Sequence, residues 1–168
     1  MTTVEPDLVK NPTVSVHKIL VAVDLTEHSK LTTSYAVAIA KCFNSSVVLV
    51  HVFEPVAFYD FPNEYTYQLV DEQRRDCEMR LAELTDTVRE MKVACQSLLL
   101  IGDPAERIGP LARELEADLI VTASHHPKFM ARLFNLDKAP QIMRRAPCPV
   151  LVYHDKAEEV GSAGIELR

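Results

Sequence analysis

The sequence has few glycines and no long apolar stretch. Only four of the 168 residues are glycine, and none lies between Gly109 and Gly161. No apolar run approaches the roughly 20 residues that a membrane-spanning helix requires. The N-terminus also lacks a basic start followed by an apolar core, which argues against a secretory signal peptide. We therefore expect a cytoplasmic protein with no membrane partner.

The chain also lacks an excess of positive charge and any clustered cysteines. Its net charge is −6, whereas a general nucleic-acid or membrane-surface binder needs a basic face. Four cysteines lie far apart, without a CxxC pair and in apolar contexts, which predicts buried, reduced thiols and no metal site. These cysteines are Cys42, Cys77, Cys95 and Cys148.

The sequence does contain short apolar runs that alternate with longer amphipathic segments. Such runs predict strands that are buried on both faces, and the segments between them are long enough for helical crossovers. This order predicts a three-layer α/β domain, with a five-stranded parallel sheet and helices on both faces. We assign the domain to residues 17–154, after a flexible lead at 1–16 and before a tail at 155–168. The predicted strands are 18–24, 47–52, 95–101, 118–123 and 148–153.

Helix boundaries follow from capping residues. Thr26 predicts the start and Asn44 the end of the first helix. A long charged helix is expected from about residue 64 to residue 92. The clearest start is Asp103-Pro104, where Glu106 completes a capping box. Apolar residues at helical spacing predict the buried stripe of each helix. The stripes are Leu31, Tyr35, Ala38, Ile39 and Cys42; then Cys77, Leu81, Leu84, Val88 and Met91; then Ile108, Leu111, Ala112 and Leu115.

Five segments stand in the order and spacing of the universal stress protein family, which the chain resembles over about residues 17–154. They are ILVAVDLTEHS, VVLVHV, GDPAERI, ADLIVTASHH and RRAPCPVLVY. The resemblance implies an adenine nucleotide alpha hydrolase-like sheet in the order 3-2-1-4-5. It also implies a homodimer through the last strand, which here begins at Pro149 and ends at Tyr153. That apolar edge would need protection in a monomer.

One branch of this family binds ATP through a glycine loop after the fourth strand, G-x-x-G followed by nine residues and G-[S/T]. Glycines there let backbone N–H groups approach the phosphates. The four motif positions fall on Ala123, His126, Leu136 and Asp137, and all four differ from the motif. Three changes add bulk, and the fourth places a carboxylate where phosphates would pass. The usual mode of ATP binding is therefore disfavoured.

The loop instead resembles the branch typified by universal stress protein A, which does not bind ATP. That branch carries a His-His pair followed by an aromatic residue, as His125, His126 and Phe129 do here. The resemblance implies a homodimeric stress-response binding or signalling module with no cofactor and no catalysis of its own. The alternative is an ATP-binding member with a degenerate loop, with slow ATP hydrolysis as its candidate activity. In that reading Asp24 and Val52 contact the nucleotide together with the four motif positions.

Several polar and aromatic residues have two readings. We favour Asp24 as a stabiliser of the adjacent helix start, and Ser124 with the two histidines as loop residues rather than a metal or catalytic site. We interpret the positively charged side chains of the loop as solvated rather than as an anion-binding site. An aromatic cluster reads as packing onto the sheet edge, with a partner surface at residues 54–70 as a third functional hypothesis. These charged and aromatic residues are Lys128, Arg132 and Lys138, and Phe58, Tyr59, Phe61, Tyr65 and Tyr67.

Overall fold

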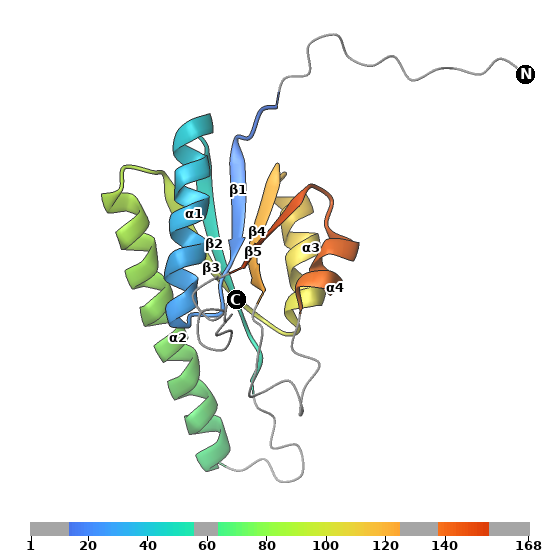
Figure 1. Cartoon of the computed structure of the whole chain (residues 1–168). Helices are drawn as coiled ribbons and strands as arrows, with labels where there is room; N and C mark the ends of the chain where they lie inside the picture. Colours follow the sequence, from blue (N-terminus) through green and yellow to red (C-terminus); the bar gives the residue numbers. More distant parts are fainter. Residues whose placement is uncertain (1–13, 56–63, 125–137, 155–168) are drawn as a thin grey trace, which may run out of the picture.

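The computed structural model describes residues 14–55, 64–124 and 138–154. These residues form a five-stranded parallel sheet in the order β3-β2-β1-β4-β5, with helices on both faces (Figure 1). The predicted three-layer fold and its strand order are confirmed. The strands are β1 Lys18–Ala22, β2 Ser46–Phe53, β3 Cys95–Ile101, β4 Leu119–Ser124 and β5 Val150–His154; the helices are α1 Glu27–Phe43, α2 Glu64–Glu90, α3 Pro104–Glu114 and α4 Ala139–Arg145.

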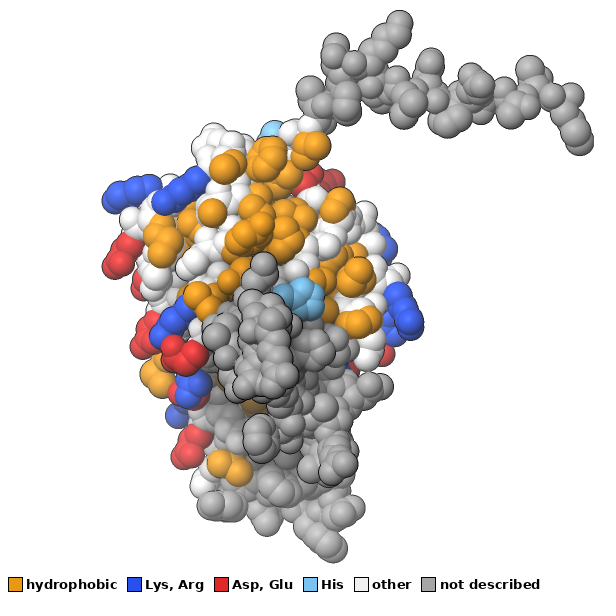
Figure 2. Space-filling view, in the orientation of Figure 1, with side chains coloured by type: hydrophobic (Ala, Val, Ile, Leu, Met, Phe, Trp, Pro, Cys, Tyr) orange, Lys and Arg blue, Asp and Glu red, His pale blue; other side chains and the backbone are white. Residues whose placement is uncertain are grey.

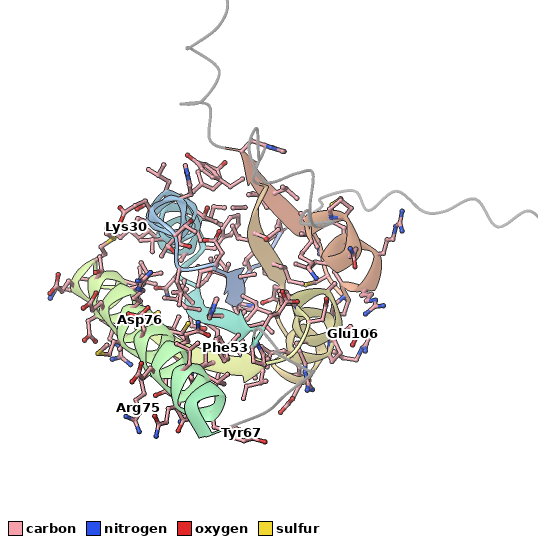
Figure 3. The ribbon with its side chains drawn as sticks, turned by 90° about the horizontal axis from the view of Figure 1, so that it is seen from below. Lys30, Phe53, Tyr67, Arg75, Asp76 and Glu106 are labelled. Carbon is pink, nitrogen blue, oxygen red and sulfur yellow. The ribbon has the colours of Figure 1, made fainter. Side chains whose placement is uncertain are left out.

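The core lies on both faces of the central strand β1. Leu20 pairs with Val48 of β2 and with Ile120 of β4, and all three side chains are buried against α3 and α4. Ile19 and Val21 point to the opposite face and pack under α1 and α2. Because successive side chains alternate between faces, a strand covered on both sides reads as a continuous apolar run. Figure 3 looks onto the carboxyl ends of the strands and shows the sheet between the two helical layers.

The buried face predicted for α1 is wrong for four of its five residues, whereas Ile39 is partly buried and packs against the core. Leu31 and Tyr35 are 45% and 46% exposed, and Ala38 and Cys42 are exposed as well. The face that packs on the sheet consists of small and hydroxyl side chains, because these let the helix lie close to the strands. Its buried members are Ser29, Thr32, Thr33, Ala36, Val37 and Ala40. The larger apolar stripe therefore faces outward.

The exposed side of α1 also corrects the prediction of buried thiols. All four cysteines are free, but only Cys95 is buried, while Cys42 is exposed and the other two are partly buried. Burial raises the pKa of Cys95 to about 11. Cys42 differs because it sits on the outward stripe of α1, where no strand covers it.

The predicted ends of α1 and α3 agree with the structure except in one detail. Asn44 closes α1 in the left-handed conformation with φ 56°, and Asp103 caps α3 by accepting a hydrogen bond of 2.7 Å from the Ala105 N–H. Pro110 lies inside α3 without breaking it. Glu106 does not complete a capping box; its carboxylate lies 3.7 Å from Arg145 Nη1, because α4 brings a cation to that side of α3.

Helix α2 extends past the sheet at its N-terminal end (Figure 1). Its 27 residues span about 40 Å, whereas the eight residues of β2 span roughly 26 Å. Tyr67 lies near the protruding end and is 67% exposed. The prediction that Tyr67 packs onto the sheet edge is therefore wrong, and the side chains of the other four aromatic residues lie outside the described part of the chain. No helix among the described residues is long and apolar enough to cross a membrane.

Candidate functional site

A cavity of about 590 Å³ opens at the carboxyl ends of β1, β2 and β4. This is the edge where ligands bind in open α/β sheets, and the volume lies within the range of about 300–1,000 Å³ that small-molecule sites occupy. The strand ends supply one wall, and the first turns of α1, α3 and α4 supply the others. Its polar lining residues include Asp24, Thr26, Ser29, His51, Glu54 and Lys138.

Asp24 is tied to the start of α1. Its Oδ1 accepts hydrogen bonds from the Thr26 backbone N–H at 3.0 Å, the Thr26 Oγ1 at 2.8 Å and the Ser29 Oγ at 2.6 Å. Thr26 occupies the N-cap position as predicted, but its own side chain makes no capping bond. The intervening Leu25 has φ 61°, a left-handed conformation that is costly for a residue with a branched side chain. The contacts match the interpretation of Asp24 as a helix-start stabiliser.

His51 forms part of the cavity wall and was missed by the sequence analysis. Its Nδ1 lies 2.8 Å from the Val23 carbonyl oxygen. Because a carbonyl can only accept, Nδ1 carries the proton, and Nε2 is the acceptor nitrogen of the neutral ring. The available signal was a single polar residue inside the apolar run VVLVHV, which marks a side chain that leaves the core at a strand's carboxyl end.

Lys138, at the start of α4, joins three loops at the mouth of the cavity. Its Nζ lies 2.5 Å from Asp103 Oδ2 and 3.3 Å from Glu54 Oε1. The hydrogen bond from Lys138 holds the pKa of Asp103 below its ordinary value, and the same bond raises the pKa of Lys138. The interpretation of Lys138 as a solvated charge is wrong, because the fold brings carboxylates from the ends of β2 and β3 against it.

The structure brings together three of the residues named in the alternative nucleotide-binding reading. Asp24, Val52 and Ala123 all line the cavity. His126, Leu136 and Asp137 lie outside the described residues, as do His125, Phe129, Lys128, Arg132 and the side chain of Ser124. Within the described part of the chain, no group of three or more His, Cys, Asp or Glu side chains is placed to hold a metal ion.

Most described polar groups of the cavity wall are paired with one another. Among its described lining residues the charged groups are Asp24, Glu54 and Lys138, so the wall carries more negative than positive charge. The hydroxyls of Thr26 and Ser29 already donate to Asp24, and that of Thr32 donates to the His28 carbonyl. Among the described residues of this wall, no hydroxyl is paired with a histidine, and Asp24 is the carboxylate that accepts from the Thr26 and Ser29 hydroxyls.

An open parallel sheet with a ligand-sized cleft at its carboxyl edge defines a doubly wound α/β binding domain. Comparison with known proteins then assigns the family. The profile of the universal stress protein family matches residues 15–154. The chain belongs to the universal stress protein family.

Two curated relatives are universal stress proteins as well. A universal stress protein of Thermus aquaticus is 33% identical over 138 residues, which cover 80% of this chain and 96% of the relative. Universal stress protein A of Escherichia coli strain K12 is 29% identical over 147 residues, covering 84% of this chain and 96% of the relative. Each match spans nearly the whole domain.

Solved structures share the fold. Universal stress protein UspA from Lactobacillus plantarum superposes with a TM-score of 0.71 at 22% identity, covering 83% of this chain and 99% of that one. An Arabidopsis thaliana family protein with AMP bound has a TM-score of 0.59 at 18% identity, covering 87% and 96% of the two chains. A further universal stress protein, solved with cAMP, has a TM-score of 0.65 at 18% identity, covering 84% and 98%.

Proposed function

We propose that this chain is a cytoplasmic universal stress protein of the branch that does not bind ATP. In this proposal it acts as a homodimeric stress-response binding or signalling module without catalysis of its own. The observation that carries the proposal is the state of Lys138, which is the one cation among the described residues of the cavity wall and is already paired with Asp103 and Glu54.

A triphosphate favours uncommitted positive charge, and the one cation among the described residues of this wall is already paired. Glu54 and Asp103 neutralise Lys138, and Asp24 adds a further negative charge to the wall. Two like charges about 4 Å apart repel by roughly 1 kcal/mol in water and by several near a protein surface. Moving Lys138 onto a phosphate would also leave two carboxylates facing each other.

The motif positions support the same conclusion. Ala123, the first of the four, lines the cavity and presents a methyl group where the motif has glycine. His126, Leu136 and Asp137 lie outside the described residues; by sequence, the first two add bulk in place of glycine, and Asp137 puts a carboxylate at the Ser/Thr position. A phosphate cradle relies on backbone N–H groups that the ligand can approach closely. These side chains oppose that approach.

The alternative remains an adenine-nucleotide binder with a degenerate loop. It draws on one observation: Asp24, Val52 and Ala123 converge on a single cavity. Structural neighbours were solved with cAMP, AMP and dAMP. Their identities to this chain, 18%, 18% and 19%, support a shared fold rather than a shared ligand.

Calorimetric titration with Mg²⁺-ATP distinguishes the two functions. We expect no binding by the unaltered chain at micromolar nucleotide. A variant that restores the motif, Ala123→Gly with His126→Gly, Leu136→Gly and Asp137→Ser, should gain affinity, because the loop then regains its phosphate cradle. Micromolar binding by the unaltered chain, or an adenine nucleotide released by heating the purified protein, would favour the alternative.

The homodimer is proposed through β5, one of the two edge strands of the described sheet. Figure 2 shows hydrophobic side chains gathered on the face that carries α1 and β5. On α1, Leu31 and Tyr35 are exposed one helical turn apart, and the Tyr35 ring lies 5.5 Å from that of Tyr153 in β5. An apolar helix stripe continuous with an unpaired strand edge favours a second copy of the chain as the partner.

The edge can be blocked without disturbing β4. The Ile120 N–H donates to the Pro149 carbonyl, so by alternation Leu151 and Tyr153 also bond toward β4, and Val152 presents its N–H to the open edge. Val152→Pro should therefore convert a dimer into a monomer of 18.9 kDa, whereas Val152→Thr should leave the dimer intact. Light scattering after size exclusion measures both, and a monomeric unaltered chain would contradict the dimer.

A further inference from the structure

One ring nitrogen of His51 has no partner among the described residues. The other nitrogen, Nδ1, donates to the Val23 carbonyl oxygen at 2.8 Å. The neutral ring therefore keeps the lone pair on Nε2, which can only accept a hydrogen bond. The bond to Val23 is the one hydrogen bond that joins this side chain to the described part of the chain. Nε2 is thus an acceptor that still lacks a donor.

This nitrogen can be reached from the cavity at the carboxyl edge of the sheet. Thr33 Oγ1 is the one side-chain nitrogen or oxygen that is both enclosed and without a partner in the described part of the chain. Because Nε2 also lacks a partner, it must keep some exposed surface. His51 is only partly buried, and it lines the carboxyl-edge cavity. A molecule in this cavity can therefore contact Nε2.

Much of the surface around the cavity is apolar. Its walls come from the sheet and from the helical layers on either side of it (Figure 3). The strand ends contribute the buried Val23 and Val52, and α3 and α4 contribute the buried Ile108 and Ile142. Packing an apolar body against such side chains is favourable, roughly in proportion to the area removed from water. The cavity therefore suits a ligand that is mainly apolar.

The charges at this edge are matched within the protein. Lys138 is held by Asp103 and Glu54. The starts of α1 and α3, whose positive ends favour an anion, already lie against the carboxylates of Asp24 and Asp103. An ionic ligand would lose its water here without gaining an uncommitted charge of the opposite sign. The wall therefore favours an uncharged molecule.

We propose that the carboxyl-edge cavity binds a small uncharged molecule with an apolar body and one O–H or N–H group that donates to His51 Nε2. Binding of this class rests on the function proposed above, in which the cavity does not hold ATP. It adds the chemical class of the ligand and names His51 as the residue that recognises it. Adenosine matches the wall poorly, because its hydroxyls and ring nitrogens need several partners and most described polar groups here are already paired.

Indole and 1-methylindole are a matched pair of probes for the full chain. They share an apolar two-ring body, but only indole has an N–H donor. The chain contains no tryptophan, so the fluorescence of either probe is measured without indole emission from the protein. Indole should give a saturable signal, and 1-methylindole should bind about fivefold more weakly. Indole-3-acetate and tryptamine, which add a negative and a positive charge, should also bind more weakly than indole.

An NMR measurement reports the contact without any substitution. In a long-range proton–nitrogen correlation spectrum of the isotope-labelled chain, the Nε2 signal of His51 should shift in proportion to the fraction of protein that has indole bound. Saturating 1-methylindole should leave this signal nearly unchanged, because it has no proton to donate. An Nε2 signal that stays fixed at saturating indole would overturn the proposed contact.

His51→Asn separates the two ring nitrogens. The asparagine N–H can replace Nδ1 opposite the Val23 carbonyl, but nothing replaces Nε2. The variant should therefore bind indole and 1-methylindole with affinities within about twofold of each other. His51→Phe keeps a ring in the cavity and should lose the preference in the same way. The control is His17→Asn, an exposed position at the opposite edge of the sheet, which should retain the fivefold preference.

The outcomes distinguish a failure of this ligand class from a failure of the function proposed above. The ligand class would be wrong if millimolar indole gave no saturable signal, if the unaltered chain bound both probes equally, or if the preference survived in His51→Asn. Tighter binding of tryptamine or indole-3-acetate than of indole would likewise overturn it. Each of these results leaves the function without ATP in place. Displacement of indole by micromolar Mg²⁺-ATP would instead overturn that function.

Discussion

Two regions of the molecule differ in how completely their polar groups are hydrogen-bonded or ion-paired. At the carboxyl edge of the sheet, Asp24 takes three hydrogen bonds and Lys138 is held by two carboxylates. Between α1 and α2, the buried Thr33 hydroxyl has no partner among the described residues. At the carboxyl edge, where this fold usually binds ligands, these polar groups are paired with one another. The hydroxyl without a partner lies in the other region.

This contrast shows that location and chemical readiness are separate properties. Parallel strands always end in a cleft at one edge, whatever residues stand there. Whether that cleft invites an anion depends on which charges the surrounding loops deliver. Here the loops after β2 and β3 deliver carboxylates that occupy the available cation. Substitutions in each region measure how much its packing and pairing contribute to stability.

The largest effect is expected at Gly109, where α3 packs closely against α4 beside the cavity at the carboxyl edge of the sheet. A Cβ at this position would lie 2.8 Å from the Arg145 carbonyl oxygen. Gly109→Ala should therefore lower the free energy of unfolding by about 2 kcal/mol, despite the better helix propensity of alanine. Urea unfolding measures the loss. The exposed Arg113→Ala in the same helix should change it by less than about 0.5 kcal/mol, and equal effects would show that the α3–α4 wall is loose.

A change of intermediate size is expected to distinguish two of the buried threonines, one in α1 and one in α2. Thr33 and Thr85 are both 3% exposed, but only Thr85 is bonded, to the Leu81 carbonyl. Thr33→Val removes an unsatisfied hydroxyl and should raise the free energy of unfolding, whereas Thr85→Val should leave it unchanged or lower it. The difference should be about 1 kcal/mol. Thermal unfolding of the ligand-free protein measures it, and loss of stability in both variants would mean that Thr33 already has a partner.

The smallest effect is expected at the ion pair between Lys138 and Asp103. Asp103→Asn should cost less than about 1 kcal/mol, because the two side chains are 36% and 25% exposed. Asparagine keeps the helix cap. The lowered pKa of Asp103 makes the pair's contribution complete above the unfolded value, about 3.9, and loses it as pH falls through the folded pKa.

The pKa of Lys138 has the opposite sign of consequence. Because it is raised, the contribution is complete below the unfolded value, about 10.4, and is lost as pH rises through the folded pKa. The difference in stability between the unaltered chain and Asp103→Asn should thus be flat from about pH 4 to pH 10 and shrink at both ends. Glu106→Gln, whose carboxylate lies 3.7 Å from Arg145, is the control. A difference that grows in acid would contradict the assigned pair.

Much of the fold could be predicted because its signals are local. Apolar runs such as that of β1 mark strands covered on both faces, and Asp103-Pro104 marks a helix start wherever it occurs. Asn44 is likewise suited to the left-handed turn that ends α1. Each signal depends on a few neighbouring residues, so the chain's order of strands and helices is visible without tertiary contacts.

The candidate site could be predicted in place but not in character. The sequence located Asp24, Val52 and Ala123 at strand ends that meet at one edge. It did not show that Glu54 and Asp103, 49 positions apart in the numbering, both reach Lys138. Charge pairing across three loops depends on distances that no sequence period reports.

The residues alone therefore determined the element order, the parallel sheet and the loss of the glycine motif. Only the tertiary structure decided which side of α1 is buried. A helix lies where its smallest side chains permit the closest approach to the sheet, so Ala36 and Ala40 face inward and Leu31 and Tyr35 face outward.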